Sequence, residues 1–147
     1  MIDTAIAHLI KPEDLQHHGT LFAGQMAKWF VEASFVAATR LSGRPQDIVC
    51  VQIHGMNFKK PAQNGDILEI KARVALTGNT SITTFAEAFV NEDDEPMVAG
   101  FITFVTVDGQ GRPYRHGLTL TEEYISQNTK IYEEARRVRE LSRPSAG

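Results

Sequence analysis

The most informative stretch of this sequence is the segment Gln16-His17-His18-Gly19-Thr20-Leu21-Phe22-Ala23-Gly24. It is a polar loop that ends in small residues and runs straight into an apolar segment with helical spacing. The first backbone N–H groups of a helix have no intrahelical acceptor and carry partial positive charge. Ala23 and Gly24 are small enough for a ligand oxygen to approach these groups closely. The segment therefore indicates either an oxyanion hole for a polarised carbonyl or a loop whose small residues serve only packing.

The residues that follow predict a helix from Gly24 to about Leu41. Trp29 and Val36 widen its apolar stripe, so we expect other elements to surround this helix rather than leave it on a surface. Ser42-Gly43-Arg44-Pro45 supplies the Gly-then-Pro signal that ends a helix. The stripe itself recurs at steps of three and four residues, at Met26, Phe30, Ala33, Ala37 and Leu41.

Strand-like segments fill most of the remaining chain. Short polar loops separate the later ones, which favours an antiparallel meander over βαβ crossovers. The predicted fold class is therefore α+β, with one antiparallel sheet wrapped around a central helix. Such a sheet leaves its edges unpaired, so we expect a second copy to cover one edge across a twofold axis. The predicted strands are Thr4–Ile10, Ile48–Phe58, Asp66–Leu76, Ser81–Val90 and Met97–Val107.

The tail predicts an additional C-terminal helix over about residues 121–141. Ile131, Ala135 and Val138 form a narrow apolar seam on it, which suits packing on the domain or on a partner subunit. Residues 143–147 are expected to fray. We see no internal repeat or linker, and residues 1–147 are predicted to form a single domain.

Composition and charge exclude several classes of protein. The chain has 147 residues and a net charge of −3, which gives no reason to expect a nucleic-acid partner. The only cysteine, Cys50, lies in an apolar run that predicts a buried strand, and it cannot form an intramolecular disulfide. No signal peptide, no membrane-spanning run and no histidine pair with metal-ligand spacing is found, so a cytoplasmic, membrane-free and metal-free protein is expected.

Beyond these arguments, the sequence resembles the hotdog-fold acyl-CoA thioesterases. The segment His18-Gly19-Thr20-Leu21-Phe22-Ala23-Gly24 is similar to the Gly-Thr-Leu-Phe-Gly-Gly signature of that family. Further blocks follow in the family's order and cover most of residues 14–113. They are residues 33–40 on the helix, 55–61, 64–66, 78–81 and 101–108.

The resemblance implies an acyl-CoA hydrolase that assembles as dimers, often as trimers of dimers, with active sites at the dimer interface. It implies that an amide side chain before the Gly-rich turn positions substrate or water, a role that falls here to Gln16. The helix-start amide near Gly24 would polarise the thioester carbonyl. An acidic residue on the central helix would act as general base or nucleophile, and the loop Gly78-Asn79-Thr80-Ser81 would contribute to binding coenzyme A. No organic cofactor is implied.

The sequence departs from the family at both key side chains. Gln16 stands where the family usually has Asn, and Val31 stands where the acid is usually found. Glu32 is one residue later, about 100° around the helix. It is a candidate for the catalytic carboxylate, and an exposed position paired with Lys28 is the alternative. His18, or its neighbour His17, is a second candidate base because its ordinary pKa lies near 6.5.

Two clusters of basic residues could contact the phosphates of coenzyme A. Lys59 and Lys60 precede Pro61 at a strand end, and Arg136, Arg137 and Arg139 lie on the C-terminal helix. The predicted function is hydrolysis of an acyl-CoA to the free acid and coenzyme A. The alternatives are a binding protein that has lost the acid and a hotdog dehydratase acting on 3-hydroxyacyl-CoA. The acyl group cannot be read from the sequence.

Overall fold

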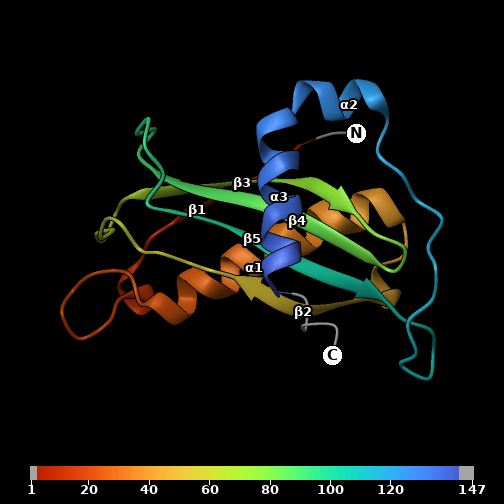
Figure 1. The fold of residues 1–147 in the computed structure, drawn as a ribbon. Helices are drawn as coiled ribbons and strands as arrows, with labels where there is room; N and C mark the ends of the chain where they lie inside the picture. The colour runs from red at the N-terminus through yellow and green to blue at the C-terminus, as the bar shows by residue number, and fades with distance from the viewer. Residues whose placement is uncertain (1–2, 143–147) are drawn as a thin grey trace.

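The computed structural model describes residues 3–142 of the chain. Its five strands form one antiparallel sheet in the order β1-β3-β4-β5-β2, with α1 packed on one face and α3 on the other (Figure 1). The predicted α+β architecture, a sheet with a central helix and an additional C-terminal helix, is confirmed. The elements are β1 (Thr4–Leu9), α1 (Ala23–Ser42), β2 (Ile48–His54), β3 (Ile67–Thr77), β4 (Ser81–Val90), β5 (Val98–Thr106), α2 (Glu122–Gln127) and α3 (Thr129–Ser142), with short 3-10 turns at Pro12–Asp14 and Pro45–Asp47.

The expected meander is only partly correct. β3, β4 and β5 do follow one another as neighbours, but β2 pairs with β5 and lies at the edge of the sheet, away from β3. The chain therefore passes the positions of β5 and β4 between β2 and β3. β2 is also shorter than predicted, because the chain leaves the strand after His54 and turns at Gly55 with a φ of +78°.

Each face of the sheet is apolar because it packs against a different helix. Alternate side chains point to opposite faces of a strand, so Val74 and Ile102 pack with α1, whereas their neighbours Ala75 and Phe101 pack against Ala135 of α3. The breadth of the apolar stripe on α1 is explained by the curved sheet that encloses it. Figure 1 shows α3 lying across the opposite face.

The C-terminal segment packs on its own domain, and it forms two helices instead of one. The two helices are separated at Asn128, which ends α2. The side-chain oxygen of Asn128 accepts a hydrogen bond of 2.6 Å from Arg73 on β3. The Tyr124 hydroxyl donates to the Val74 carbonyl at 2.6 Å, which ties α2 to the same strand. The prediction that residues 143–147 fray falls outside the described residues.

The prediction for Cys50 is wrong. Its thiol is exposed, because β2 is an edge strand with a bulge between Cys50 and Gln52. Exposed apolar side chains share this edge, with Val49 40%, Val51 55% and Ile53 44% exposed. Within residues 3–142, no helix is long and apolar enough to cross a bilayer. The same residues contain no cluster of His, Cys, Asp and Glu that could hold a metal ion.

Gly100 provides a test of how closely β2 and β5 pack. A methyl group at this buried position would lie 2.4 Å from the backbone carbonyl oxygen of Gly55. Gly100→Ala should therefore lower the free energy of unfolding by about 1–3 kcal/mol, since backbone must move to make room. Gly109→Ala, whose methyl meets nothing within 4 Å, is the matched control. Equal chemical denaturation midpoints for both variants would contradict the packing described.

Candidate functional site

The loop before α1 is held in shape by hydrogen bonds across its base. The backbone N–H of Gln16 donates to the Thr20 carbonyl at 2.8 Å, and the N–H of Gly19 donates back to the Gln16 carbonyl at 2.9 Å. The Gln16 side-chain amide also donates to the Thr20 hydroxyl at 2.8 Å. These contacts fix the side chain of Gln16 and leave His17 and His18 at the exposed tip.

The helix then starts with two unpaired donors. The Phe22 carbonyl accepts from the N–H groups of Gln25 and Met26, at 3.0 and 3.1 Å. The N–H groups of Ala23 and Gly24 have no acceptor among the described residues, and both residues are exposed. The start of α1 therefore leaves two oriented N–H groups unpaired, as expected for the first residues of a helix.

Asp14 anchors this loop, and the sequence analysis did not single it out. Its carboxylate is only 4% exposed and accepts from the Lys11 N–H at 2.9 Å and from the Gln25 side chain at 2.8 Å. The hydrogen bond from the Lys11 backbone holds the pKa of Asp14 below its ordinary value, against the effect of burial. The sequence does contain one sign of this role. Asp14 stands three residues after Lys11 in a turn that begins with Pro12, a spacing at which an acidic side chain can accept from the backbone N–H before the turn.

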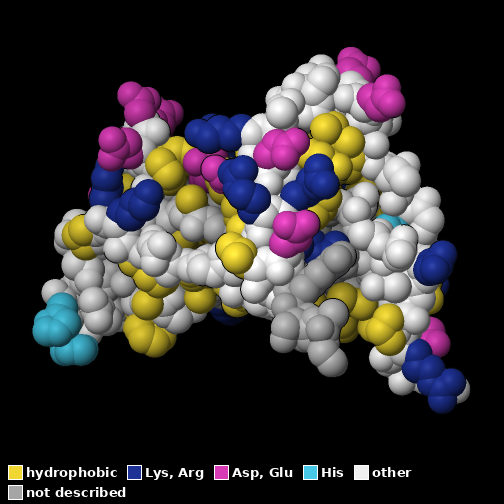
Figure 2. Space-filling model, viewed as in Figure 1, with side chains coloured by type: hydrophobic (Ala, Val, Ile, Leu, Met, Phe, Trp, Pro, Cys, Tyr) yellow, Lys and Arg dark blue, Asp and Glu magenta, His cyan; other side chains and the backbone are white. Residues whose placement is uncertain are grey.

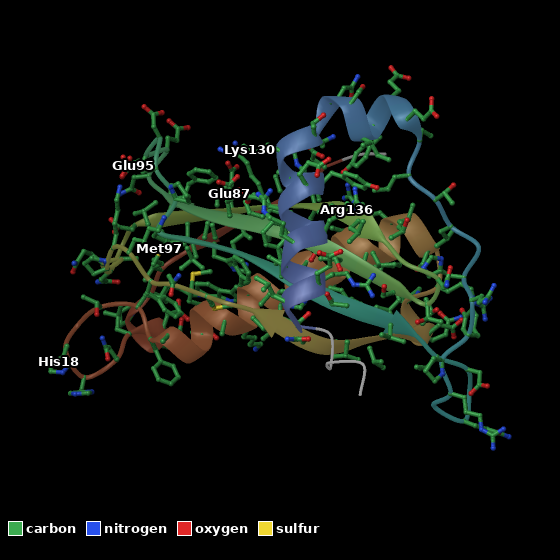
Figure 3. The ribbon with its side chains drawn as sticks, in the orientation of Figure 1. His18, Glu87, Glu95, Met97, Lys130 and Arg136 are labelled. Carbon is green, nitrogen blue, oxygen red and sulfur yellow. The ribbon has the colours of Figure 1, made fainter. Side chains whose placement is uncertain are left out.

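A pocket of about 420 Å³ opens beside the helix start. It brings together Gln16, Ala23, Lys59 and Lys60, which the sequence analysis placed in one site from separate parts of the chain. Apolar side chains supply much of the rest of its wall. Figure 3 labels Met97 at this end of the molecule, with His18 farther out on the loop. The other lining residues are Thr20, Leu21, Phe22, Met26, Phe58, Pro61, Ala62 and Met97.

The two lysines of this pocket differ in their surroundings. The Lys60 ammonium contacts Asp93 at 2.6 Å and Glu95 at 3.8 Å, and the hydrogen bond to Asp93 raises the pKa of Lys60. Lys59 is exposed and forms no ion pair among the described residues. Lys59 is therefore the better placed of the two to meet a phosphate.

The predicted bases do not line this pocket within one chain. His17 and His18 form a tilted ring pair, with centroids 4.0 Å apart, on the outermost part of the loop, where Figure 2 shows the histidine side chains projecting into solvent. The hydrogen bond between the Gln16 N–H and the Thr20 carbonyl closes a turn, and His17 and His18 lie at the exposed tip of that turn. His18 is therefore separated from the helix start by the turn itself.

Glu32 lies on the side of α1 that is turned toward β1. Trp29, three residues earlier, stacks on His8 of β1 with ring centroids 4.1 Å apart. Burial lowers the pKa of His8, and the nearby Glu32 carboxylate opposes that shift. Glu32 is exposed and forms no ion pair with Lys28 or any other described residue.

The neighbouring side of α1, about 60° around the helix from Glu32, faces β5, which lies beside the β2 edge. Phe35 packs edge-on against Phe104 of β5, the strand beside β2, with centroids 5.9 Å apart. At 3.6 residues per turn, Val31 and Gly24 lie on the same side of the helix as Phe35. Val31, which the family resemblance places at the position of the acid, thus shares a face with the helix start.

The loop Gly78-Asn79-Thr80-Ser81 is the turn between β3 and β4, at the other end of the sheet. Met97 of the pocket pairs with Ala88, seven residues along β4 from Ser81. Since a strand rises about 3.4 Å per residue, the turn and the pocket are roughly 24 Å apart along the strand. One chain therefore divides the predicted coenzyme A contacts between two ends of the molecule.

Comparison with known proteins identifies the family. The sequence profile of the thioesterase superfamily matches residues 18–97, more than half of the chain. An acyl-CoA thioester hydrolase of Buchnera aphidicola (subspecies Baizongia pistaciae) is 31% identical over 113 residues, covering 71% of this chain and 82% of that protein. The chain belongs to the thioesterase superfamily.

Solved structures agree with this thioesterase-superfamily assignment. The hexameric thioesterase y2039 of Yersinia pestis superimposes with a TM-score of 0.69 at 28% identity, covering 79% of this chain and 94% of that one. An acyl-CoA hydrolase of Staphylococcus aureus, 23% identical, matches the fold with a TM-score of 0.81 over 95% of this chain and 82% of that one. The hotdog fold and the family predicted from the sequence are both confirmed.

Proposed function

We propose that this protein hydrolyses acyl-CoA thioesters to a free acid and coenzyme A. The observation that carries the proposal is the pair of unpaired N–H groups at Ala23 and Gly24, which lie at the edge of a pocket beside Gln16. Oriented backbone donors of this kind stabilise the oxyanion that forms when a carbonyl is attacked. The names of its relatives within the thioesterase superfamily support the same reaction.

In the proposed reaction, the thioester carbonyl oxygen accepts hydrogen bonds from the two N–H groups. Gln16, held by Thr20, orients the attacking water or the substrate. The water oxygen attacks the carbonyl carbon while Glu32, the only carboxylate on α1, takes its proton. Since Glu32 lies about 12 Å along α1 from the helix start of its own chain, we assign this role to Glu32 of the second copy that the next paragraph proposes. The tetrahedral intermediate then collapses and the C–S bond breaks. The coenzyme A thiolate leaves and takes the proton from Glu32, which restores the carboxylate. The scheme needs no metal or organic cofactor.

We further propose that the site is completed by a second copy of the chain, paired through the β2 edge. Within residues 3–142, β2 pairs with β5 on one side only, and this edge strand exposes Val49, Val51 and Ile53. A twofold axis at this edge turns the β3–β4 turn of one copy toward the helix start of the other. The Yersinia pestis relative is hexameric, which is compatible with three such dimers. The exposed thiol of Cys50 suits the reducing, cytoplasmic compartment expected from the sequence.

A second candidate function is supported by Val31. This residue cannot transfer a proton, yet it faces the same side of α1 as Gly24. A chain with oriented N–H donors and no base in reach would bind an acyl-CoA without cleaving it. Glu32 is therefore the residue that separates a hydrolase from a binding protein.

The test is thiol release from a panel of short, long and aromatic acyl-CoAs. We expect turnover by the wild type, and a fall of about 100-fold or more in kcat for Glu32→Gln, since a general base contributes about 10²–10⁴-fold. Glu133→Gln, an exposed carboxylate on α3, is the matched control. Retention of activity in Glu32→Gln would keep the hydrolase and remove Glu32 from the mechanism. Tight acyl-CoA binding without thiol release would favour the binding protein.

A further inference from the structure

The edge strand β2 ends at His54, whose ring begins a chain of hydrogen bonds that runs across the sheet. The Nε2 atom of His54 lies 2.7 Å from the Thr103 hydroxyl of β5, and that hydroxyl lies 2.9 Å from the Thr83 hydroxyl of β4. Thr83 is completely buried and Thr103 is 7% exposed, whereas His54 is half-buried. This hydrogen-bond chain therefore joins the edge strand to the central strand of the sheet.

The hydrogen-bond chain lies on the face of the sheet that α3 covers. Thr103 is two residues after Phe101 on β5, so both point to the same face, and Phe101 packs with Ala135 of α3. Figure 1 shows α3 crossing this face toward β2. Among the described residues, Arg139 of α3 is the charged group that acts on the His54 ring, while the side chains of β4 and β5 in the hydrogen-bond chain are uncharged.

The direction of these hydrogen bonds depends on the charge of His54. A neutral ring with its proton on Nδ1 accepts at Nε2 from Thr103, whose oxygen in turn accepts from Thr83. Both hydroxyl protons are then used. A charged ring carries a proton on Nε2 and must donate to Thr103, so Thr103 donates to Thr83 and the Thr83 proton has no acceptor among the described residues. Because a buried donor without an acceptor is costly, the neutral ring is favoured.

Two further effects favour the neutral ring. Burial lowers the pKa of His54, and the positive charge of Arg139 lowers it further. The contribution of the neutral ring is therefore complete above the ordinary pKa of about 6.5 and is lost as pH falls through the lower pKa of the folded chain. Acid thus reverses the bond between Thr103 and the ring.

His54 is also the last strand residue before a segment that lines the pocket beside α1. Gly55 turns the chain out of the sheet at a φ of +78°, and residues 58–61 then form part of the pocket wall. Residues 56–58 form no backbone hydrogen bond with a described residue. The next bond runs from the Lys59 N–H to the Met97 carbonyl, at 2.8 Å. The segment between His54 and Lys59 is thus held at its two ends.

We propose that His54 is a positioning residue that holds this part of the pocket wall in place only while its ring is neutral. The proposal rests on the proposed function, because the pocket is where the thioester would bind. When the ring gains a proton from water, the end of β2 moves away from Thr103 and the pocket wall that follows it moves as well. Acid therefore weakens substrate binding and leaves the chemical step of the bound substrate unchanged.

Hydrogen exchange of the full chain tests the proposal without catalysis. After correction for intrinsic exchange, the peptide that contains Lys59 should lose about tenfold in protection between about pH 7.5 and pH 5.5, as expected when a buried hydroxyl loses its acceptor. His54→Gln keeps an oxygen that accepts from Thr103 but cannot gain a proton, so its protection should not change with pH. His8→Gln, which removes a half-buried histidine on the opposite edge strand β1, is the matched control and should exchange like the wild type.

Thiol release gives a second measurement. On lowering the pH over the same range, KM for an acyl-CoA should rise about tenfold more in the wild type than in His54→Gln, because only the wild type loses the neutral ring. The pH profile of kcat should be the same in both, since His54 does not contact the reacting atoms. A purely structural role for His54 would not produce this separation of KM from kcat.

The same pH dependence of protection in the wild type and in His54→Gln would overturn the proposal. So would wild-type protection that does not change with pH, a measurement that needs no variant and is unaffected if His54→Gln fails to fold. Protection at Lys59 that falls with pH in a chain that releases no thiol would support the role of His54, and would overturn the proposed hydrolysis separately.

Discussion

Val51→Lys should convert the assembled protein into single chains and remove almost all of its thiol-release activity, by about 100-fold or more. Val51 is 55% exposed on β2, the edge strand on which Val49 and Ile53 are also exposed. Lysine on an edge strand blocks strand pairing between chains, because its charge would have to lose water at the interface. We expect activity to fall with assembly because, in the proposed dimer, the helix-start pocket of one copy and the β3–β4 turn of the other form one site. Light scattering after size exclusion gives the mass, and thiol release gives the activity.

Ala5→Lys is the matched control. Ala5 is exposed on β1, the other edge of the same sheet, so the substitution adds the same charge to an edge strand. It should leave both mass and activity unchanged. If Val51→Lys kept the wild-type mass while Ala5→Lys lost it, the interface would be at β1 and the proposed pairing would be wrong.

Asp14→Ala should have the second large effect, a loss of about 2 kcal/mol in the free energy of unfolding together with a fall in activity. The substitution removes a buried carboxylate and leaves the Lys11 N–H and the Gln25 amide without their acceptor. The backbone carbonyl of Asp14, which the substitution keeps, accepts from the Phe22 N–H at 2.9 Å, so a shift of this turn would reach the helix start. Urea denaturation and thiol release measure the two effects.

The effect of Asp14 should depend on pH in one direction. Its pKa is lowered in the folded chain, so its stabilising contribution is complete above the ordinary value of about 3.9 and is lost as pH falls below it. The difference in unfolding free energy between wild type and Asp14→Ala should therefore shrink as pH is lowered from 6 to about 3. A difference that stayed constant over this range would show that the carboxylate charge is not what holds the loop. Asp66→Ala, in the turn directly before β3, is the control for losing a carboxylate that accepts two hydrogen bonds.

The sequence alone determined most of the elements and the start of α1. The three- and four-residue spacing of Met26, Phe30 and Ala33 predicted α1, and Ser81–Val90 was predicted with the bounds that β4 has. These features depend on local periodicity and on capping and turn residues, which act within a few positions of the chain. The small residues at the helix start and the family resemblance likewise indicated the unpaired N–H groups and the fold.

Only the tertiary structure decided how these parts meet. Pairing of β2 with β5 joins residues about fifty positions apart, and it turned Cys50 from an expected buried residue into an exposed one. The rotation of α1 against the sheet placed Glu32 near His8 and Val31 toward the β2 edge. Lys60 forms an ion pair with Asp93, which lies in the turn between β4 and β5. None of these contacts leaves a local pattern, because each is selected by the packing of the whole sheet against α1, where burial of apolar area outweighs the preferences of any single segment.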